Sequence, residues 1–260
     1  MAKIESQSAK REKAGTYMKI GCAHAPFHNK KQFNSTFKFL QKEGIKLQGL
    51  VLNGDFLDMN SLSSHDKGQM PIEGVKLGWE YREASKLIKE LESLDYTSNA
   101  TFDYIYGNHC YRYFRRIKEL ESHKVSDVIP SPEQGLGLDN KWSIHTNWKE
   151  DFVKLGKYLN VFHGEFTNIH TAKKHLDTYR ESVAYNHTHR YQVYVEGMMG
   201  AFNGGFAGDI DSPVFGYATR AMKRSWMNNI DLIHIDKDGY YHMQPLNFIN
   251  NQLIVNGRKY

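Results

Sequence analysis

The sequence predicts an α/β fold, and two observations support this prediction. Apolar runs typical of strands alternate with helical segments through the first two-thirds of the 260 residues, and short strand-like runs dominate the last third. Several of these runs also end in polar side chains of types that bind metals or substrates. In α/β sheets, functional sites form outside the carboxyl ends of the strands, so this pattern is typical of such a fold.

The first half of the chain is expected to contain three strands, each followed by a helix. The predicted strands cover residues 16–21, 47–52 and 102–106. The predicted helices cover residues 30–43, 71–94 and 111–123. Phe33, Phe37 and Leu40 recur near helical spacing in the first helix, and Gly44 is a plausible end for it.

The second half is expected to consist of short strands with a single helix. Residues 126–142 contain several prolines and glycines and are expected to form a variable loop, not a domain linker. The predicted helix covers residues 169–176 and could extend to 179. The predicted strands cover residues 142–148, 151–155, 158–162, 182–185, 191–196, 230–235, 240–245 and 252–255. Residues 197–208 are rich in glycine. We predict a flexible arm over residues 1–15 and one domain over residues 16–260.

Composition indicates a globular protein. Apolar residues make up 40% and charged residues 24% of the chain, and the net charge is +5 with a pI near 8.9. This mild basicity permits an anionic partner such as nucleic acid but does not require one. Two cysteines, Cys22 and Cys110, do not form a disulfide framework, which favours the cytoplasm. The polar N-terminus does not read as a signal peptide, and no apolar run reaches the roughly 18 residues of a membrane span.

Five apolar runs end in side chains that could bind metals. The segments that follow them are Cys22–His24, Asn53–Asp58, Gly107–His109, His163–Glu165 and Asn186–His189. Alone, Asp55 could be a buried acid, a turn residue or a metal ligand. As a set, these segments supply the carboxylate, imidazole and amide ligands that two metal ions need in order to activate a bridging hydroxide for attack on a phosphate ester. Such a ligand set suits Mn, Fe, Zn or Ni better than Mg or Ca.

In their order along the chain, these segments resemble those of the calcineurin-like metallophosphoesterases. The resemblance extends from about residue 16 to residue 192 and includes all five segments. It implies a four-layer α/β/β/α sandwich of two mixed sheets flanked by helices, with a site for two divalent ions at one edge. The unusual first segment is similar to that of phage-encoded members, for which the host cytoplasm would be the location.

The resemblance also implies a role for each residue. His24 and His189 would join Asp55 at one ion, and Asp55 would bridge to a second ion. That second ion would be held by Asn108, His163 and His187. His109 would act as the general acid or stabilise the leaving oxygen as a cation, and Asp58 would orient His109 or a ligand.

Two departures from the family pattern concern cysteine. Cys22 stands where the family has an aspartate. As a thiolate it could bind Zn or Fe at the first ion; the alternative is that it does not bind and that the first site is weak. Cys110 stands where an acid usually follows His109. A milder departure is Asn186, which replaces a glycine.

A cluster of arginines directly after His109 is the candidate substrate surface. If the segment is helical, Arg112, Arg115 and Arg116 share one face. This face could bind the phosphates of a nucleic acid, a nucleotide or a phosphoprotein, or it could simply be solvated. The expected function is therefore a dimetal phosphoesterase that cleaves phosphodiesters, with a nuclease among the candidates. The alternatives are a phosphomonoesterase that acts on protein or small metabolites, and a non-catalytic relative that binds phosphate or nucleic acid.

Overall fold

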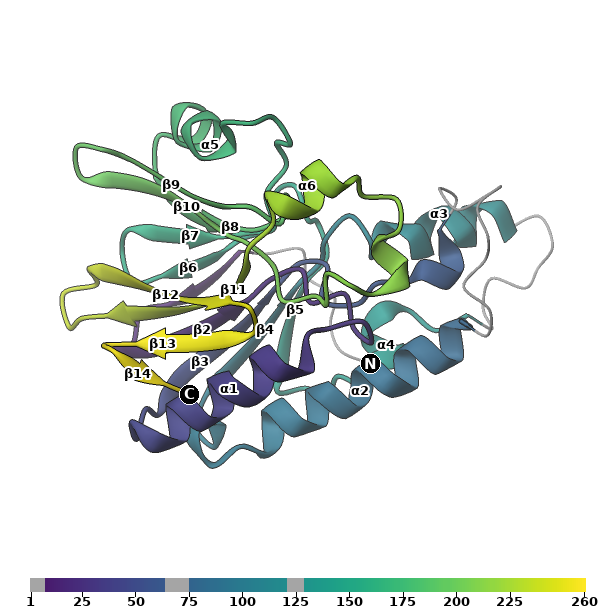
Figure 1. Cartoon of the computed structure of the whole chain (residues 1–260), viewed down its shortest axis with the longest axis horizontal. Helices are drawn as coiled ribbons and strands as arrows, with labels where there is room; N and C mark the ends of the chain where they lie inside the picture. Colours follow the sequence, from purple (N-terminus) through teal and green to yellow (C-terminus); the bar gives the residue numbers. More distant parts are fainter. Residues whose placement is uncertain (1–7, 64–74, 121–128) are drawn as a thin grey trace.

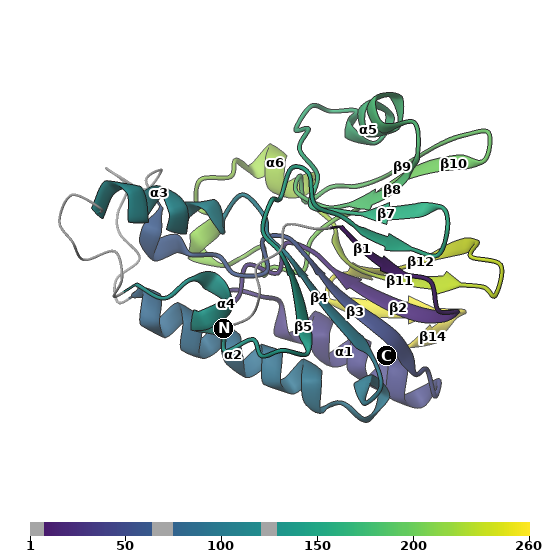
Figure 2. The same cartoon turned by 180° about the vertical axis from the view of Figure 1, so that it is seen from behind.

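The structure is a computed structural model, and it describes residues 8–63, 75–120 and 129–260. Two mixed sheets pack face to face, and helices cover their outer faces (Figure 1). Seen from behind, the two sheets remain distinct layers between the helices (Figure 2). The predicted four-layer α/β/β/α sandwich is therefore confirmed.

The larger sheet has eight strands in the order β14-β13-β12-β11-β2-β3-β4-β5. Strands β2 to β5 are parallel, and the remaining pairs are antiparallel. The strands are β2 (Gly15–Ile20), β3 (Leu47–Asn53), β4 (Thr101–Ile105), β5 (Trp142–His145), β11 (Asn228–Ile235), β12 (Tyr241–Ile249), β13 (Gln252–Val255) and β14 (Arg258–Lys259).

The smaller sheet has six strands in the order β1-β6-β7-β8-β10-β9. It combines parallel and antiparallel pairs. The strands are β1 (Ala9–Arg11), β6 (Val153–Leu155), β7 (Leu159–Val161), β8 (Ser182–Tyr185), β9 (Tyr191–Glu196) and β10 (Met199–Gly204).

Each sheet has its own helical cover. Helices α1 (Lys30–Lys42) and α2 (Leu77–Ser93) cover the larger sheet, with the short α4 (Pro132–Leu136) packed on α2. Helix α5 (Thr171–Tyr179) covers the smaller sheet. Helices α3 (Tyr111–Leu120) and α6 (Arg220–Arg224) flank the end of the sandwich where β2, β3 and β4 finish (Figure 1). Among the described residues, no helix combines the length and apolarity that crossing a membrane requires.

Three hydrophobic cores separate the four layers. The largest lies between the larger sheet and its helices and includes Leu52 and Leu87. A second lies between the two sheets, where Val51 and Ile105 face Val161. The third packs Leu176 of α5 against Val183 and neighbouring residues of the smaller sheet. Because the strands are pleated, Val51 and Leu52 face opposite cores, so β3 contributes to both cores that border the larger sheet.

The sequence predicted the ends of α1 well. The Asn29 side chain caps the helix by accepting a hydrogen bond from the backbone N–H of Gln32 at 3.2 Å. Gly44, with φ of 64°, follows the last turn and takes the left-handed conformation that glycine adopts at little cost.

The flexible arm predicted over residues 1–15 is wrong where the structure describes a strand. Residues Ala9–Arg11 form β1 and pair in parallel with β6. The Arg11 guanidinium crosses to the larger sheet and donates to both carboxylate oxygens of Asp103, at 2.9 and 2.7 Å. This bidentate pair and the strand pairing order a polar segment that has no apolar pattern of its own.

Other boundaries differ for local reasons. Strand β10 lies in the glycine-rich segment that carried no strand prediction; Gly204 sits there because a Cβ would lie 2.3 Å from an Asp231 oxygen. Helix α2 begins at Leu77, and residues 71–74 of the predicted helix lie outside the described residues. Helix α3 is described to Leu120, so residues 121–123 of its predicted range also fall outside. Strand β5 ends at His145, which leaves Trp148 in a loop.

Candidate metal centre

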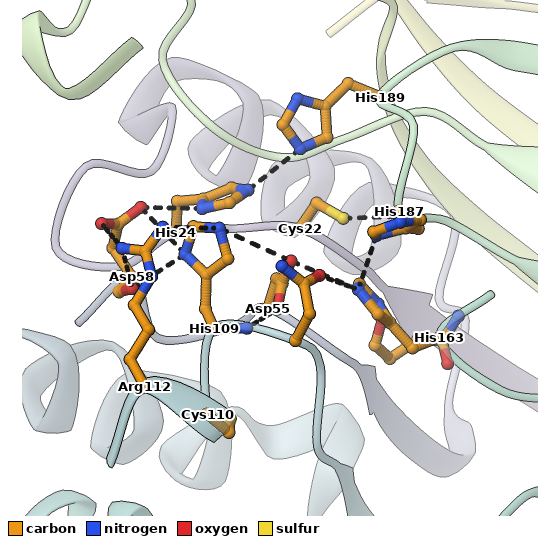
Figure 3. A network of polar contacts seen from close by, with 12 residues as sticks. Cys22, His24, Asp55, Asp58, His109, Cys110, Arg112, His163, His187 and His189 are labelled. Carbon is orange, nitrogen blue, oxygen red and sulfur yellow. Dashed lines mark hydrogen bonds and ion pairs between the residues drawn. The ribbon is translucent and has the colours of Figure 1, made fainter. Parts of the chain in front are cut away.

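The five predicted segments meet at one end of the sandwich. Those after β2, β3 and β4 come from the larger sheet, and those after β7 and β8 come from the smaller sheet. Figure 3 shows their side chains converging on one small volume. The site is therefore built from both sheets, at the carboxyl ends of strands, as the sequence predicted.

Among the residues that the structure describes, potential ligand atoms form three groups, and within each group all atoms lie within 4.8 Å of one another. One group contains Cys22, His24 and His189. A second contains Cys22, Asp55 and His163. A third contains His24, Asp58 and His109. All of these residues are buried.

His163 shows why a cation suits this site. Its Nε2 lies 3.2 Å from Asp55 Oδ2, 3.1 Å from Asn108 Oδ1 and 3.2 Å from His187 Nδ1. A ring nitrogen carries at most one proton, so it cannot donate to all three. An ion among these four atoms would satisfy them together, and oxygen and imidazole donors suit a divalent transition metal.

His24 is oriented by Asp58. Its Nδ1 lies 2.8 Å from Asp58 Oδ2, and its Nε2 lies 3.0 Å from His189 Nε2. A carboxylate that accepts the Nδ1 proton leaves the Nε2 lone pair free for a metal, which is the common arrangement behind metal-binding histidines. Asp58 thus lies behind a candidate ligand.

The surroundings of the candidate imidazole and carboxylate ligands keep these groups in the forms that bind metals. It lowers the pKa of His24 and His189, and it lowers the pKa of His187 to about 3. These imidazoles are therefore neutral near pH 7 and offer lone pairs. Burial alone would raise the pKa of Asp55, but the neighbouring His109 and His163 hold it well below its ordinary value. Asp55 is thus an anion.

Cys22 is fully buried, and its sulfur accepts a hydrogen bond from the backbone N–H of His187 at 3.3 Å. Burial, together with the Asp55 carboxylate, raises the pKa of the Cys22 thiol well above its ordinary value. A thiolate at this position would therefore need a cation beside it. Cys110 differs: it belongs to none of the three groups, and its sulfur lies 3.7 Å from the Tyr104 hydroxyl. Both cysteines are free.

His109 lies at the edge of the cluster, with its ring held between Asp58 and Arg112. Its Nδ1 donates to the Asp58 carbonyl oxygen at 2.8 Å, and its Nε2 lies 3.1 Å from Arg112 Nη2. Burial lowers the pKa of His109, but the carboxylates of Asp55 and Asp58 outweigh burial and raise it overall. Nε2 is the atom that could exchange a proton with a bound substrate.

Backbone strain is concentrated in this cluster. Ten described non-glycine residues have positive φ, and half of them are candidate ligands; these are Cys22, His24, Asp55, His187 and His189. Non-glycine residues in the left-handed region cost of the order of 1–3 kcal/mol each when the conformation is poorly populated. Such strain clusters at functional sites because the surrounding structure holds the side chains in useful directions.

The three arginines of the predicted substrate surface separate in the structure. Arg112 is mostly buried and contacts Asp58 and His109. Arg115 and Arg116 are exposed, and Arg116 pairs with Glu119 at 2.8 Å. Only Arg112 is thus brought to the ligand cluster.

Sequence reasoning missed a buried polar network that supports the ligand loops. The Asn186 side-chain oxygen accepts from Lys19 Nζ at 2.7 Å and from Asn53 Nδ2 at 2.8 Å, and its Nδ2 donates to the Gly205 carbonyl at 3.0 Å. It thereby ties the end of β8 to the ends of β2 and β3. The departure from glycine at position 186 was the available signal.

Trp148 was also missed as part of the site. Its ring centroid lies 5.9 Å from that of His163 and 6.1 Å from that of His187. It thus forms an aromatic wall beside the ligand cluster. An aromatic residue shortly after a strand end was the signal, but the expected strand to residue 148 concealed it.

No family model matches the sequence, and no curated protein is significantly similar to it. Some solved structures are similar over most of the chain. Vacuolar protein sorting 29 from Cryptosporidium parvum is 13% identical with a TM-score of 0.44, and the match covers 90% of this chain and 98% of that one. A conserved uncharacterised protein from Streptococcus pneumoniae, described as a predicted phosphoesterase, is 11% identical with a TM-score of 0.39, covering 96% and 98%. Wild-type Vps29 from Entamoeba histolytica, complexed with zinc, is 11% identical with a TM-score of 0.39, covering 89% and 98%. Similarity at this level assigns neither activity nor ligands.

Proposed function

We propose that the chain is a phosphoesterase of the calcineurin-like type that uses two divalent metal ions. The observation that carries this proposal is the convergence of five separate strand ends on one set of imidazole, carboxylate, amide and thiol groups. His163 Nε2 alone has three ligand-type atoms within 3.2 Å. One ring nitrogen with a single proton cannot donate to all of these atoms in a hydrogen-bonded core, whereas a metal ion can bind all of them.

The proposed ligands divide into two sets around Asp55. One ion would be held by Cys22, His24 and His189, and the other by Asn108, His163 and His187, and Asp55 would contribute to both. Bound divalent ions would supply an activated water and neutralise the charge of the phosphoryl group.

The chain's own residues then bind and protonate the substrate. Arg112 would hold a phosphoryl oxygen. His109 Nε2 would deliver a proton to the leaving oxygen. Because Arg112 Nη2 now donates to Nε2, it must turn toward the substrate before His109 can carry a proton there.

Phosphodiesters, including those of nucleic acid, are the proposed substrates. Trp148 stands beside His163 and His187, where a base on one side of a scissile phosphate could stack. The mild basicity of the chain agrees with such an anionic substrate.

Metal analysis and a paired substrate assay test this function. The purified protein is stripped of metal, reloaded with Mn, Fe, Zn or Ni, and given bis(p-nitrophenyl) phosphate and p-nitrophenyl phosphate. We expect two ions per chain and faster turnover of the diester. Preference for the monoester would instead support a phosphomonoesterase. Two bound ions without turnover of either compound, in a folded sample, would leave a non-catalytic binding protein.

A further inference from the structure

Cys22 belongs to two groups of potential ligands at once. Its sulfur lies within 4.8 Å of the nitrogens of His24 and His189 in one group, and of the ligand atoms of Asp55 and His163 in the other. Figure 3 shows Cys22 between these two sets. Ligand atoms around one tetrahedral zinc ion lie about 3.3–3.6 Å apart, so small shifts would let each group surround its own ion.

The position of the sulfur is fixed from both sides. The Cys22 backbone N–H donates to the Gly54 carbonyl at 3.0 Å, which ties the residue to the Asp55 loop. The sulfur in turn accepts the backbone N–H of His187 at 3.3 Å, which ties it to the loop after β8. Because φ at Cys22 is 48°, the side chain is directed by a left-handed backbone. The thiol therefore stays between the two groups.

Both oxygens of the Asp55 carboxylate already have a polar neighbour. Its Oδ1 accepts the backbone N–H of His109 at 2.9 Å, and its Oδ2 lies 3.2 Å from His163 Nε2. A thiolate has enough lone pairs to bind two cations, and it prefers softer ions than a carboxylate does. We propose that the Cys22 thiolate bridges both metal ions together with Asp55, and that this bridge selects zinc or iron over manganese.

This inference rests on the metal site of the proposed function and revises the expectation that Cys22 serves a single ion. The competing explanation is that Cys22 is a small apolar residue. It packs with Phe206, Val214 and Phe215, and a buried free cysteine often does nothing more. Metal binding distinguishes the two explanations, because packing gives no spectroscopic signal.

Cobalt titration of the metal-free protein under anaerobic conditions is the test. A thiolate bound to cobalt gives a near-ultraviolet charge-transfer band. We expect the band to grow through both the first and the second equivalent of cobalt, and the two bound ions to show magnetic coupling. Cys22→Ser should lose the band and weaken binding of both ions by at least about 100-fold, since changes in outer contacts alone cost 10–100-fold.

Two further variants complete the experiment. Cys110→Ser is the matched control and should behave as the unaltered protein, because Cys110 lies outside the ligand groups. Cys22→Asp should fold, lose the band and bind manganese more tightly than the unaltered protein does.

A band that saturates at one equivalent, with one site intact in Cys22→Ser, would overturn the bridge. Absence of any band would show that Cys22 is not a ligand. Phosphoester hydrolysis is measured separately, so its failure would refute the function without touching the bridge.

Discussion

Lys19 and Asp231 form a buried ion pair beneath the ligand loops, with 2.9 Å between Nζ and Oδ2 and almost no exposure of either side chain. Lys19 lies on β2 and Asp231 on β11, so the pair joins neighbouring strands of the larger sheet. The same ammonium also reaches Asn186 of the smaller sheet. The buried Lys19 ammonium group thus connects the core of the larger sheet to the loop that carries His187 and His189.

Removing one partner of this pair should destabilise the protein strongly. Asp231→Leu leaves the Lys19 charge buried and uncompensated, and we expect a loss of about 3–5 kcal/mol in the free energy of unfolding, measured by denaturant titration. Lys19→Met combined with Asp231→Leu should recover much of this loss, because a buried pair replaced by apolar residues is often neutral. A loss below 1 kcal/mol for Asp231→Leu alone would contradict the burial of the pair.

His109→Ala should lower turnover by about 10²–10⁴-fold while both metal ions stay bound. The reason is that His109 is the proposed proton donor, whereas its ring is held by Asp58 and Arg112 and it is not among the proposed ligands. Metal content by elemental analysis and phosphodiester turnover are measured on the same sample. His242→Ala, on the exposed face of β12, serves as the control. If metal is lost along with activity, His109 is a ligand and not a proton donor.

Arg112→Ala should reduce kcat/KM by about 10–100-fold, since a hydrogen bond to a charged group contributes roughly 1.5–3 kcal/mol. Arg116→Ala is a close control, because it lies on the same helix but is exposed and pairs with Glu119. Steady-state kinetics on the diester compare the two. Equal losses would mean that the whole helix, and not Arg112 alone, contacts the substrate.

Stability should fall as the pH is lowered from 6.5 toward 4. Burial lowers the pKa of His175 from 6.5 to about 4, and the ring stacks on Tyr185 with centroids 3.9 Å apart. As the pH falls, His175 is therefore protonated in the unfolded chain before it is protonated in the folded chain. The free energy of unfolding should then be about 3 kcal/mol lower near pH 4 than above pH 6.5.

His175→Gln should flatten this part of the stability curve, as followed by unfolding at several pH values. His28, whose pKa burial also lowers to about 4, should account for a similar part. A curve whose slope is the same with and without His175 would show that the ring is accessible to protons in the folded state.

The sequence could indicate which side chains gather at this end of the sandwich, because each of them lies shortly after an apolar strand. His24, Asp55 and His163 are recognisable from a few neighbouring residues. The supporting contacts are not local in this way. Lys19 and Asp231 are more than 200 positions apart, and neither residue carries a signal of its partner.

Two strands, β10 and β1, were not predicted, because packing and not the strand propensity of their residues determines their conformation. In β10, glycine is required by the close approach of Asp231 and Lys19, although glycine in a sequence argues against a strand. In β1, a polar segment becomes a strand because it pairs with β6 and because Arg11 reaches Asp103. These partners of β10 and β1 lie far away in the sequence, so the sequence alone does not reveal these contacts.

The Arg11–Asp103 contact has a practical consequence for anyone who shortens this chain. Arg11 belongs to the smaller sheet and Asp103 to the larger one, where His145 also contacts the carboxylate at 3.0 Å. The polar N-terminal segment, which looks dispensable in the sequence, therefore joins the two sheets through this ion pair. Trimming to residue 16 would strip an edge strand and leave a buried carboxylate without its guanidinium, so a minimal version should keep everything from Ala9 onward.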